Sequence, residues 1–203
     1  MEVNAQIFKA YDIRGIYQQD FDEDLACKLG KAYVKLRQQE LGRENITVVS
    51  ARDMRLSSES LQASVIKGMV EAGAAVININ LASTPTFYFA VAHYGYDGGI
   101  QVSASHNPSK YNGFKMVRER ALPIGEGKGM EEIKALVLGA DLPAASLAGS
   151  VTDKAGVIAD QVAHDLEHVD LSSIKPMTVV IDTANAMGAT FFDELFAHLP
   201  QIK

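Results

Sequence analysis

"ITVVSARDMRLSSESLQASVIKGMVEAGAAVINI", residues 46–79, contains the pattern that decides the fold. Its first residues, 46–49, are apolar and rich in β-branched side chains, as in a buried strand. Apolar residues then recur at helical spacing, at Leu61, Val65, Ile66, Met69 and Val70. Ser57 or Ser58 is placed to cap this helix. A second apolar strand follows, so the stretch predicts a strand, a helix and another strand.

The same alternation continues on both sides of this stretch. We expect a helix over about 22–41, a strand at 75–79, a helix from Thr84 to about Tyr94, and a strand at 99–102. Strands that alternate with helices predict an α/β fold, with a mixed or mostly parallel sheet sandwiched by helices. Ligands of such folds bind at the carboxyl ends of the strands.

The last part of the chain has the same pattern but stops early. After a helix near 130–138, residues 139–153 are rich in Ala, Gly, Ser and Asp and are predicted to be a linker. A helix over about 155–169, a strand at 177–181 and a helix ending near Leu199 then follow. One strand cannot form a sheet alone. We therefore predict a first domain over residues 1–150 and a linker with the truncated start of a similar second domain over 151–203. The unpartnered strand gives this piece a means of self-association.

Composition excludes several classes of protein. The formal net charge of −6 argues against a nucleic-acid surface or an anionic membrane as partner. No apolar run approaches the ~20 residues of a membrane span, and the N-terminus does not have the pattern of a secretory signal. The single cysteine, Cys27, excludes an internal disulfide and is expected to be a core residue. We expect a soluble, cytoplasmic protein.

The stretch "ASHNPSKYNGFK", residues 104–115, is the candidate site. Ser105 lies just past the end of the predicted strand 99–102, where α/β sheets bind ligands. His106, Lys110 and Lys115 make the surroundings cationic and rich in donors, which suits a phosphate. Ser, Asn and Pro are also the commonest turn residues, so an ordinary surface turn is the alternative at this point.

A family resemblance decides between these readings. "SASHNPSKYNGFK" (103–115) resembles the phosphoserine loop of the α-D-phosphohexomutases, the phosphomannomutase and phosphoglucomutase family. Other stretches that resemble the family are "FKAYDIRG" (8–15), "ARDMRLSS" (51–58), "STPTFYFAV" (83–91), "VVIDTANAMGA" (179–189) and "GFKMVRERALPIG" (113–125). The stretch at 179–189 departs from the family pattern, because Ala186 stands where an Asn-Gly pair is usual. The resemblance implies phosphohexomutase domain 1 and the start of domain 2.

The resemblance also implies a reaction and its residues. Ser105 would carry a phosphoryl group and exchange it with a hexose phosphate, glucose or mannose, through a hexose 1,6-bisphosphate that also serves as activator. His106, Lys115 and Arg14 match family active-site positions, and Tyr11 joins Arg14, Ser105 and Lys115 as substrate-binding. We predict Lys115 as the acid/base group, because neighbouring cations favour its neutral amine. Mg²⁺ would bind the phosphoryl group of Ser105, with its other ligands outside this chain, so the chain alone is expected to be inactive.

Three alternatives stay open. Asp53 and Arg55 could form a structural ion pair at a strand end rather than a functional site. "HDLEH" (164–168) fits an inverted zinc-protease pattern, with His164, Glu167 and His168 as the groups of a zinc hydrolase. A non-catalytic module that binds sugar phosphates is the third possibility.

Overall fold

The computed structural model describes residues 4–140 and 142–203. Its strands are β1 (Ile13–Ile16), β2 (Thr47–Arg52), β3 (Ala75–Leu81), β4 (Gly98–Val102), β5 (Tyr111–Arg118) and β6 (Ser150–Asp153). Its helices are α1 (Glu23–Leu41), α2 (Ser58–Glu71), α3 (Thr84–His93), α4 (Met130–Leu138), α5 (Val157–Leu166) and α6 (Ala189–Ala197). Short 3-10 turns lie at Ala5–Ile7, Glu119–Ala121 and Leu171–Ser173.

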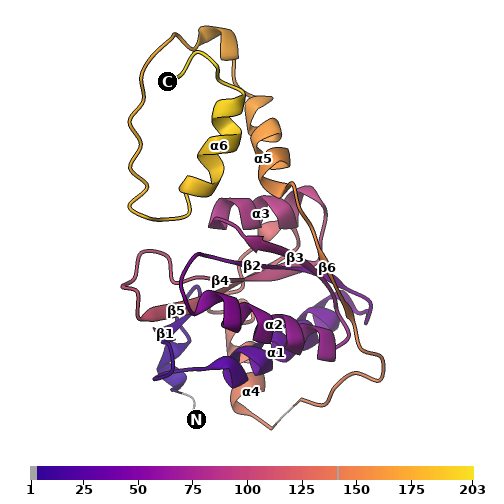
Figure 1. Cartoon of the computed structure of the whole chain (residues 1–203). Helices are drawn as coiled ribbons and strands as arrows, with labels where there is room; N and C mark the ends of the chain where they lie inside the picture. The colour runs from indigo at the N-terminus through magenta and orange to yellow at the C-terminus, as the bar shows by residue number, and fades with distance from the viewer. Residues whose placement is uncertain (1–3, 141) are drawn as a thin grey trace.

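The strands form one mixed sheet in the order β1-β5-β4-β2-β3-β6. β2 is parallel to both β3 and β4, and β6 is parallel to β3. β5 runs antiparallel to β4 and to β1. Helices α1, α2 and α4 cover one face of this sheet, and α3 covers the other (Figure 1). The expected class, a mixed α/β sheet between helices, is confirmed.

Local signals in the sequence fix the ends of the long helix α1. The Asp22 side chain caps its start by accepting a hydrogen bond from the backbone N–H of Leu25, at 3.1 Å. Glu23 and Asp24 follow in the first turn, where the helix dipole stabilises negatively charged side chains. Gly42 ends the helix with a left-handed φ of 65°, a conformation that glycine adopts at little cost.

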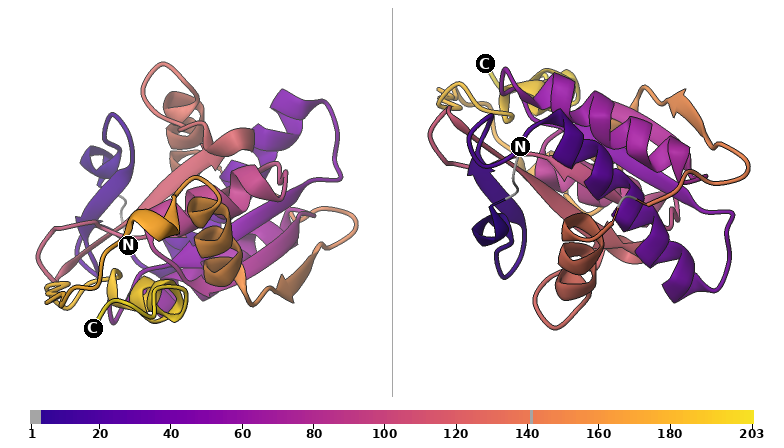
Figure 2. Two further views of the ribbon diagram at one scale, coloured as in Figure 1. Left: turned by 90° about the horizontal axis from the view of Figure 1, so that it is seen from above. Right: turned by 90° about the horizontal axis from the view of Figure 1, so that it is seen from below.

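The core lies in two layers that follow the sheet. The larger layer packs α1, α2 and α4 against one face, around side chains such as Leu29, Leu61 and Phe114. The smaller layer packs α3 against the other face, around Phe87 and Val49. Seen from below, α1 and α2 lie side by side across the sheet (Figure 2). This two-sided burial explains why the central strands are apolar on both faces.

The structure corrects the predicted linker. Residues 150–153 form strand β6, which extends the sheet along β3 with Ser150 opposite Ala75 and Asp153 opposite Asn78. All four β6 residues are exposed. An exposed edge strand with polar side chains has no buried face, so its sequence does not show the alternation that identifies other strands. The linker prediction is therefore wrong for these four residues.

The predicted strand at 177–181 is also wrong. Met177 and Val179 bond only to the short stretch 201–203, and no strand is assigned there. Val180 is 93% exposed. A strand is stable only when a neighbouring strand pairs with it along its length. Among the described residues, segment 177–181 pairs only with residues 201–203, so no regular strand forms. Helices α5 and α6 lie beyond α3, away from the sheet (Figure 1).

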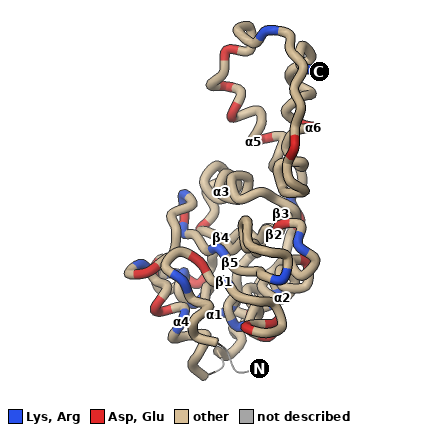
Figure 3. Tube along the Cα trace, turned by 90° about the vertical axis from the view of Figure 1, so that its left-hand side faces the viewer, with Lys and Arg blue, Asp and Glu red and all other residues tan. Residues whose placement is uncertain are grey.

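None of the helices that the structure describes combines the length and the apolar content that a membrane crossing needs. Lys and Arg residues are mixed with Asp and Glu residues over the part of the chain around the sheet (Figure 3).

Candidate active site

Ser105 lies on the loop 103–110, which joins the carboxyl end of β4 to the start of β5. Because β4 and β5 are antiparallel neighbours, this loop is the end of a hairpin. The backbone N–H of Ser103 donates to the Gly113 carbonyl at 2.9 Å, which closes the hairpin below the loop. Ser105 and His106 are exposed at its tip. The sheet thus presents this serine to solvent at the edge where α/β sheets bind ligands.

The backbone of Ser105 is in the left-handed region, with φ of 55°. Non-glycine residues adopt this conformation rarely and at a cost, and it persists only when surrounding contacts hold it. Two such contacts exist. The Ser105 N–H donates to Ser103 Oγ at 3.1 Å, and its carbonyl accepts from Arg55 Nη2 at 3.0 Å. The Ser105 hydroxyl lies 3.2 Å from Nδ1 of His106.

Arg55, in the segment between β2 and α2, bonds to most of this loop. Its Nη1 donates to the carbonyls of Pro108 and Tyr111, at 2.9 and 3.0 Å. Its Nη2 donates to the carbonyls of Ser105 and Asn107, at 3.0 and 2.6 Å. The arginine side chain is only 13% exposed. One guanidinium therefore binds four carbonyls between residues 105 and 111, three in the loop and one at the first residue of β5.

Asp53 orients this arginine. Its Oδ2 accepts from Arg55 Nε at 3.2 Å, and its Oδ1 accepts from the Arg55 backbone N–H at 3.0 Å and from Ser58 Oγ at 2.6 Å. The ion pair predicted as one alternative for Asp53 and Arg55 is present. Sequence reasoning did not connect it with the serine loop, because the four acceptors are backbone carbonyls about 50 residues away.

Asn112 connects the loop to the start of α2. Its amide nitrogen donates to Ser57 Oγ at 2.9 Å and to Ser58 Oγ at 3.0 Å. Ser57 occupies the N-cap position of α2 but makes no side-chain capping hydrogen bond. Ser57, one of the two predicted serines, is therefore the N-cap residue, but neither hydroxyl makes the predicted capping hydrogen bond. Their hydroxyls bind Asn112 instead, and Ser58 also donates to Asp53.

Arg14 reaches the same loop from β1. Its Nη1 donates to the side-chain oxygen of Asn107 at 2.7 Å. Its Nη2 forms an ion pair with Asp12, and the ammonium of Lys115 lies 3.5 Å from that carboxylate. Lys115 is on β5 rather than in the loop, in register with Gln101 of β4. The structure thus brings Arg14 and Lys115 together through Asp12, a carboxylate that the sequence argument about neighbouring cations left out.

A pocket of about 900 Å³ opens beside Ser105. One wall is the serine loop, with His106 and Lys110 among its lining residues, and another is the segment 53–56. The third wall is the turn 184–187, which belongs to the stretch predicted as the start of a second domain. Tyr11, another predicted site residue, is 78% exposed and does not line this pocket. The volume suits a ligand the size of a sugar phosphate.

The groups around Ser105 do not form a Mg²⁺ site of their own. The cations Arg55 and Lys110 are among the residues that line the pocket beside it, and the two nearby carboxylates, Asp12 and Asp53, are engaged by Arg14 and Arg55. Mg²⁺ needs about six oxygen ligands in an octahedron and is usually bound through free carboxylates. In residues 4–140 and 142–203, no group of three or more His, Cys, Asp or Glu is arranged to hold a metal ion.

The two histidines of the zinc-hydrolase alternative lie next to each other, with ring centroids 5.4 Å apart. Helix α5 ends before His168, and the His164 ring contacts Phe89 of α3 edge-on, at 5.5 Å. A ring packed against α3 stabilises the contact between these helices. Within the described part of the chain no third ligand completes a metal site, so the zinc-hydrolase alternative is not favoured.

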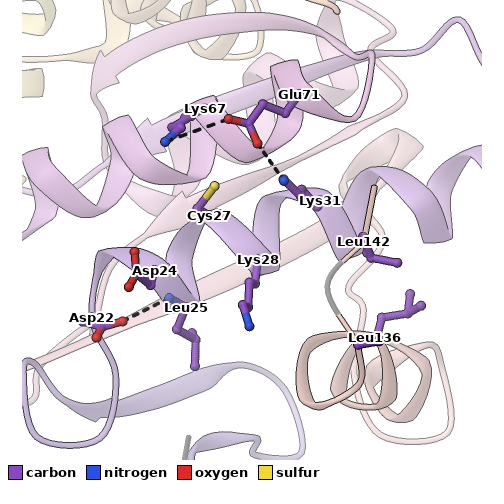
Figure 4. Close-up of a pocket in the computed structure, with 11 residues that line it drawn as sticks. Asp22, Asp24, Leu25, Cys27, Lys28, Lys31, Lys67, Glu71, Leu136 and Leu142 are labelled. Atoms are coloured by element: carbon purple, nitrogen blue, oxygen red, sulfur yellow. Dashed lines mark hydrogen bonds and ion pairs between the residues drawn. The ribbon is translucent and has the colours of Figure 1, made fainter. Parts of the chain in front are cut away.

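Cys27 lies in a different pocket, of about 480 Å³, between α1, α2 and α4 (Figure 4). Burial, followed by the charge of Glu71, raises the pKa of its thiol, which keeps it protonated and weakly nucleophilic. Glu71 accepts a hydrogen bond from Lys31, which lowers the pKa of the carboxyl. Lys31 and Lys67 of this pocket both pair with Glu71, and Cys27 is half-buried rather than fully in the core.

The structure thus defines an α/β domain that presents one serine on an arginine-bound hairpin, beside a pocket large enough for a sugar phosphate. Residues 5–143 match the family model described as phosphoglucomutase/phosphomannomutase, alpha/beta/alpha domain I. The chain belongs to this family.

Individual relatives agree with the family assignment. A phosphomannomutase from Salmonella montevideo is 35% identical over 197 residues, which cover 97% of this chain and 42% of that protein. A phosphomannomutase from Klebsiella pneumoniae is 45% identical over 129 residues, which cover 64% of this chain and 78% of that sequence. The crystal structure of a phosphoglucomutase/phosphomannomutase family protein from Burkholderia thailandensis superposes with a TM-score of 0.80 at 30% identity, covering 99% of this chain and 43% of that one. This chain spans about 40% of the length of the Salmonella montevideo protein and of phosphomannomutases from Vibrio cholerae and Escherichia coli.

Proposed function

We propose that these residues form the phosphoryl-carrying part of a phosphohexomutase that interconverts hexose 6-phosphate and hexose 1-phosphate, with mannose, glucose or both as the sugar. The observation that carries the proposal is the placement of Ser105. Its hydroxyl is exposed at the carboxyl edge of the sheet, on a backbone held in the left-handed region, in a chain of this family. Family membership and this geometry together favour a serine that carries a phosphoryl group.

In the proposed reaction, phosphorylated Ser105 transfers its phosphoryl group to the free hydroxyl of the hexose phosphate. The bond from phosphorus to the serine oxygen breaks as the bond to the sugar oxygen forms. The sugar hydroxyl gives its proton to a base, and the serine oxygen takes up a proton to become a hydroxyl. The product is a hexose 1,6-bisphosphate. Transfer of its other phosphoryl group back to the serine completes the isomerisation.

The cationic groups near the loop fit this chemistry. Phosphoryl transfer passes through a loose transition state, so the protein acts mainly by placing groups and by stabilising dispersed charge. Arg14 is held beside the loop by Asn107, and we propose that it binds the transferring phosphoryl group. Lys115 is the proposed acid/base group, and His106 contacts the serine hydroxyl directly. Asp12 holds Arg14 and Lys115 side by side.

The proposal includes Mg²⁺ as cofactor and hexose 1,6-bisphosphate as activator, in the cytoplasm. The carboxylates that complete a Mg²⁺ site have to come from outside the described residues, so we expect residues 1–203 alone not to interconvert hexose phosphates. We keep residues 1–150 and 151–203 as proposed domain 1 and the proposed start of domain 2. Self-association through the exposed stretch 177–181 is a further part of the proposal.

The test uses a full-length enzyme, in which residues 1–203 are followed by the further domains that the longer relatives have. Ser105→Ala should lower the rate of conversion between mannose 1-phosphate and mannose 6-phosphate by at least about 1,000-fold, because the covalent acceptor is lost. Intact-mass measurement should show that it no longer carries a phosphoryl group. Ser109→Ala, on the same loop, is the matched control and should retain both the activity and the phosphoryl group. Full activity of the Ser105→Ala enzyme would refute the proposal, whereas binding of mannose 6-phosphate with no conversion by the unsubstituted enzyme would favour a binding module.

A further inference from the structure

Arg55 binds the serine loop more extensively than any other side chain in the described part of the chain. All four of its loop partners are main-chain carbonyls, at 2.6 to 3.0 Å. Carbonyls are present whatever the side chains are, so this interaction fixes the path of the backbone rather than any one side chain. An arginine in this arrangement has no remaining donors for a substrate, because Nε is bound to Asp53.

The four acceptors run from the tip of the loop to the start of β5. Ser105, Asn107 and Pro108 are in the loop, and Tyr111 is the first residue of β5. A planar guanidinium has donors in a rigid fork, so it can tie both arms of a turn together at once. A lysine ammonium has three donors on a flexible stem and cannot reproduce this pattern.

The bond from Arg55 to the Ser105 carbonyl acts on the residue that has the rare left-handed backbone. Rotation of Ser105 into the ordinary region would turn its carbonyl away from this partner. Such a rotation would also re-aim the hydroxyl, which leaves the same Cα. The direction of the hydroxyl is therefore coupled to a side chain that does not contact it.

Asp53 and α2 make the arginine itself rigid. The carboxylate that binds Nε is also bound by the Ser58 hydroxyl, at 2.6 Å, in the first turn of α2. The Asp53 backbone N–H donates to the Val102 carbonyl of β4, at 2.9 Å. Arg55 is thus attached to the strand that leads into the serine loop and to the helix beside it, so loop and arginine share one support.

We propose that Arg55 is a positioning residue, which holds the backbone of residues 105–111 through four of its carbonyls and so aims the Ser105 hydroxyl into the pocket. This inference rests on the proposed function of Ser105, but its structural part can be tested without any activity. The test compares hydrogen–deuterium exchange of the 203-residue chain with that of its Arg55→Lys variant. The informative amides are those of Asn107 and Tyr111, which donate to the Ala104 and Pro108 carbonyls inside the loop.

Arg55→Lys should accelerate exchange at these loop amides by at least tenfold, while amides of β2 and β4 exchange at unchanged rates. The matched control is Arg52→Lys, three positions earlier, whose guanidinium lies 3.7 Å from the Glu59 carboxylate, on the first turn of α2. Arg52→Lys should leave the exchange rates of the loop amides unchanged. Asp53→Asn, which keeps an acceptor but removes the charge, is the second variant and should accelerate the loop amides by a smaller factor. Unchanged loop exchange in both variants, or equal acceleration over the whole sheet, would overturn the proposal.

A kinetic measurement in the full-length enzyme separates positioning from substrate binding. Arg55→Lys should lower kcat by about tenfold or more and change KM less than twofold, because the arginine has no free donor for the substrate. A KM effect with unchanged kcat would contradict positioning. If the unsubstituted enzyme lacks mutase activity, the proposed function fails, and the exchange result still decides whether Arg55 holds the loop.

Discussion

Replacement of Gly68 by alanine tests the closest approach between α1 and α2. A Cβ atom added at Gly68 would lie 2.0 Å from the carbonyl oxygen of Cys27, and 2.9 and 3.2 Å from its C and Cα. Cβ atoms essentially never approach another atom more closely than 3.0 Å, so the two helices have to move apart here by at least about 1 Å. Backbone atoms make this contact, so rotation of a side chain cannot relieve it.

Two opposing effects set the size of the change. Alanine in a helix interior is favoured over glycine by about 0.5–1 kcal/mol, through propensity. Overpacking a filled interior costs about 1–3 kcal/mol and occasionally more, and the backbone clash puts Gly68 at the upper end. We expect a net loss of about 2 kcal/mol in the free energy of unfolding. For a chain of about 200 residues this lowers Tm by roughly 4–8 °C.

Thermal unfolding followed by circular dichroism measures this difference. The control is Lys67→Ala, one position earlier in the same helix, where an exposed side chain makes a long ion pair of 3.9 Å with Glu71. Its change in stability should stay within about 0.5 kcal/mol. A Gly68→Ala variant as stable as the natural chain, or more stable, would show that helix propensity outweighs the contact and that the two helices are not packed this closely.

Two further predictions concern other buried or charged groups. The hydroxyl of fully buried Tyr33 donates to the Val117 carbonyl at 2.7 Å, so Tyr33→Phe should cost about 1–2 kcal/mol and lower Tm by about 2–8 °C, with no change in the circular dichroism of the folded state. Hydrogen bonds from the Ile16 backbone N–H and, second, from the Asn4 side chain lower the pKa of Asp20. The ionised carboxylate therefore stabilises the folded state above about pH 4, and this stabilisation is lost as the pH falls through the lowered pKa. Asp20→Asn should therefore reduce the urea midpoint at pH 7, and the difference from the natural chain should shrink below pH 4; a difference independent of pH between 3 and 7 would contradict this account.

The sequence predicts the central elements of the fold well, because buried helices and strands carry strong periodicity. Helix α1 is expected at 22–41 and observed at Glu23–Leu41, and the helix at 130–138 matches α4. β5 was not predicted as a strand, since its start was included in the polar loop that ends at Lys115. The edge strands β1 and β6 are four residues each, too short for a pattern to stand out.

For the candidate site, the sequence predicts the central residue but not the contacts that support it. The prediction of Ser105 rests on a motif, because the proposed chemistry would leave a signature in a short stretch of residues. The supporting contacts leave none, since Arg55 binds main-chain carbonyls and Asp12 acts on two residues brought close only by the pairing of β1 with β5. Such contacts depend on the register of strands distant in sequence, and they become visible only when the sheet is assembled.

The position of β1 at one edge of the sheet has a consequence for biosynthesis. Its neighbour in the described sheet is β5, and residues 17–110, 94 in all, are made between the two strands. At a synthesis rate of about 5–20 residues per second, β1 leaves the ribosome roughly 5–20 s before its partner is complete. During that interval its backbone hydrogen-bonding groups and Ile13, which becomes fully buried, are open to chaperones or to other nascent chains. Arg14, which β1 carries, joins the serine loop only when that interval ends.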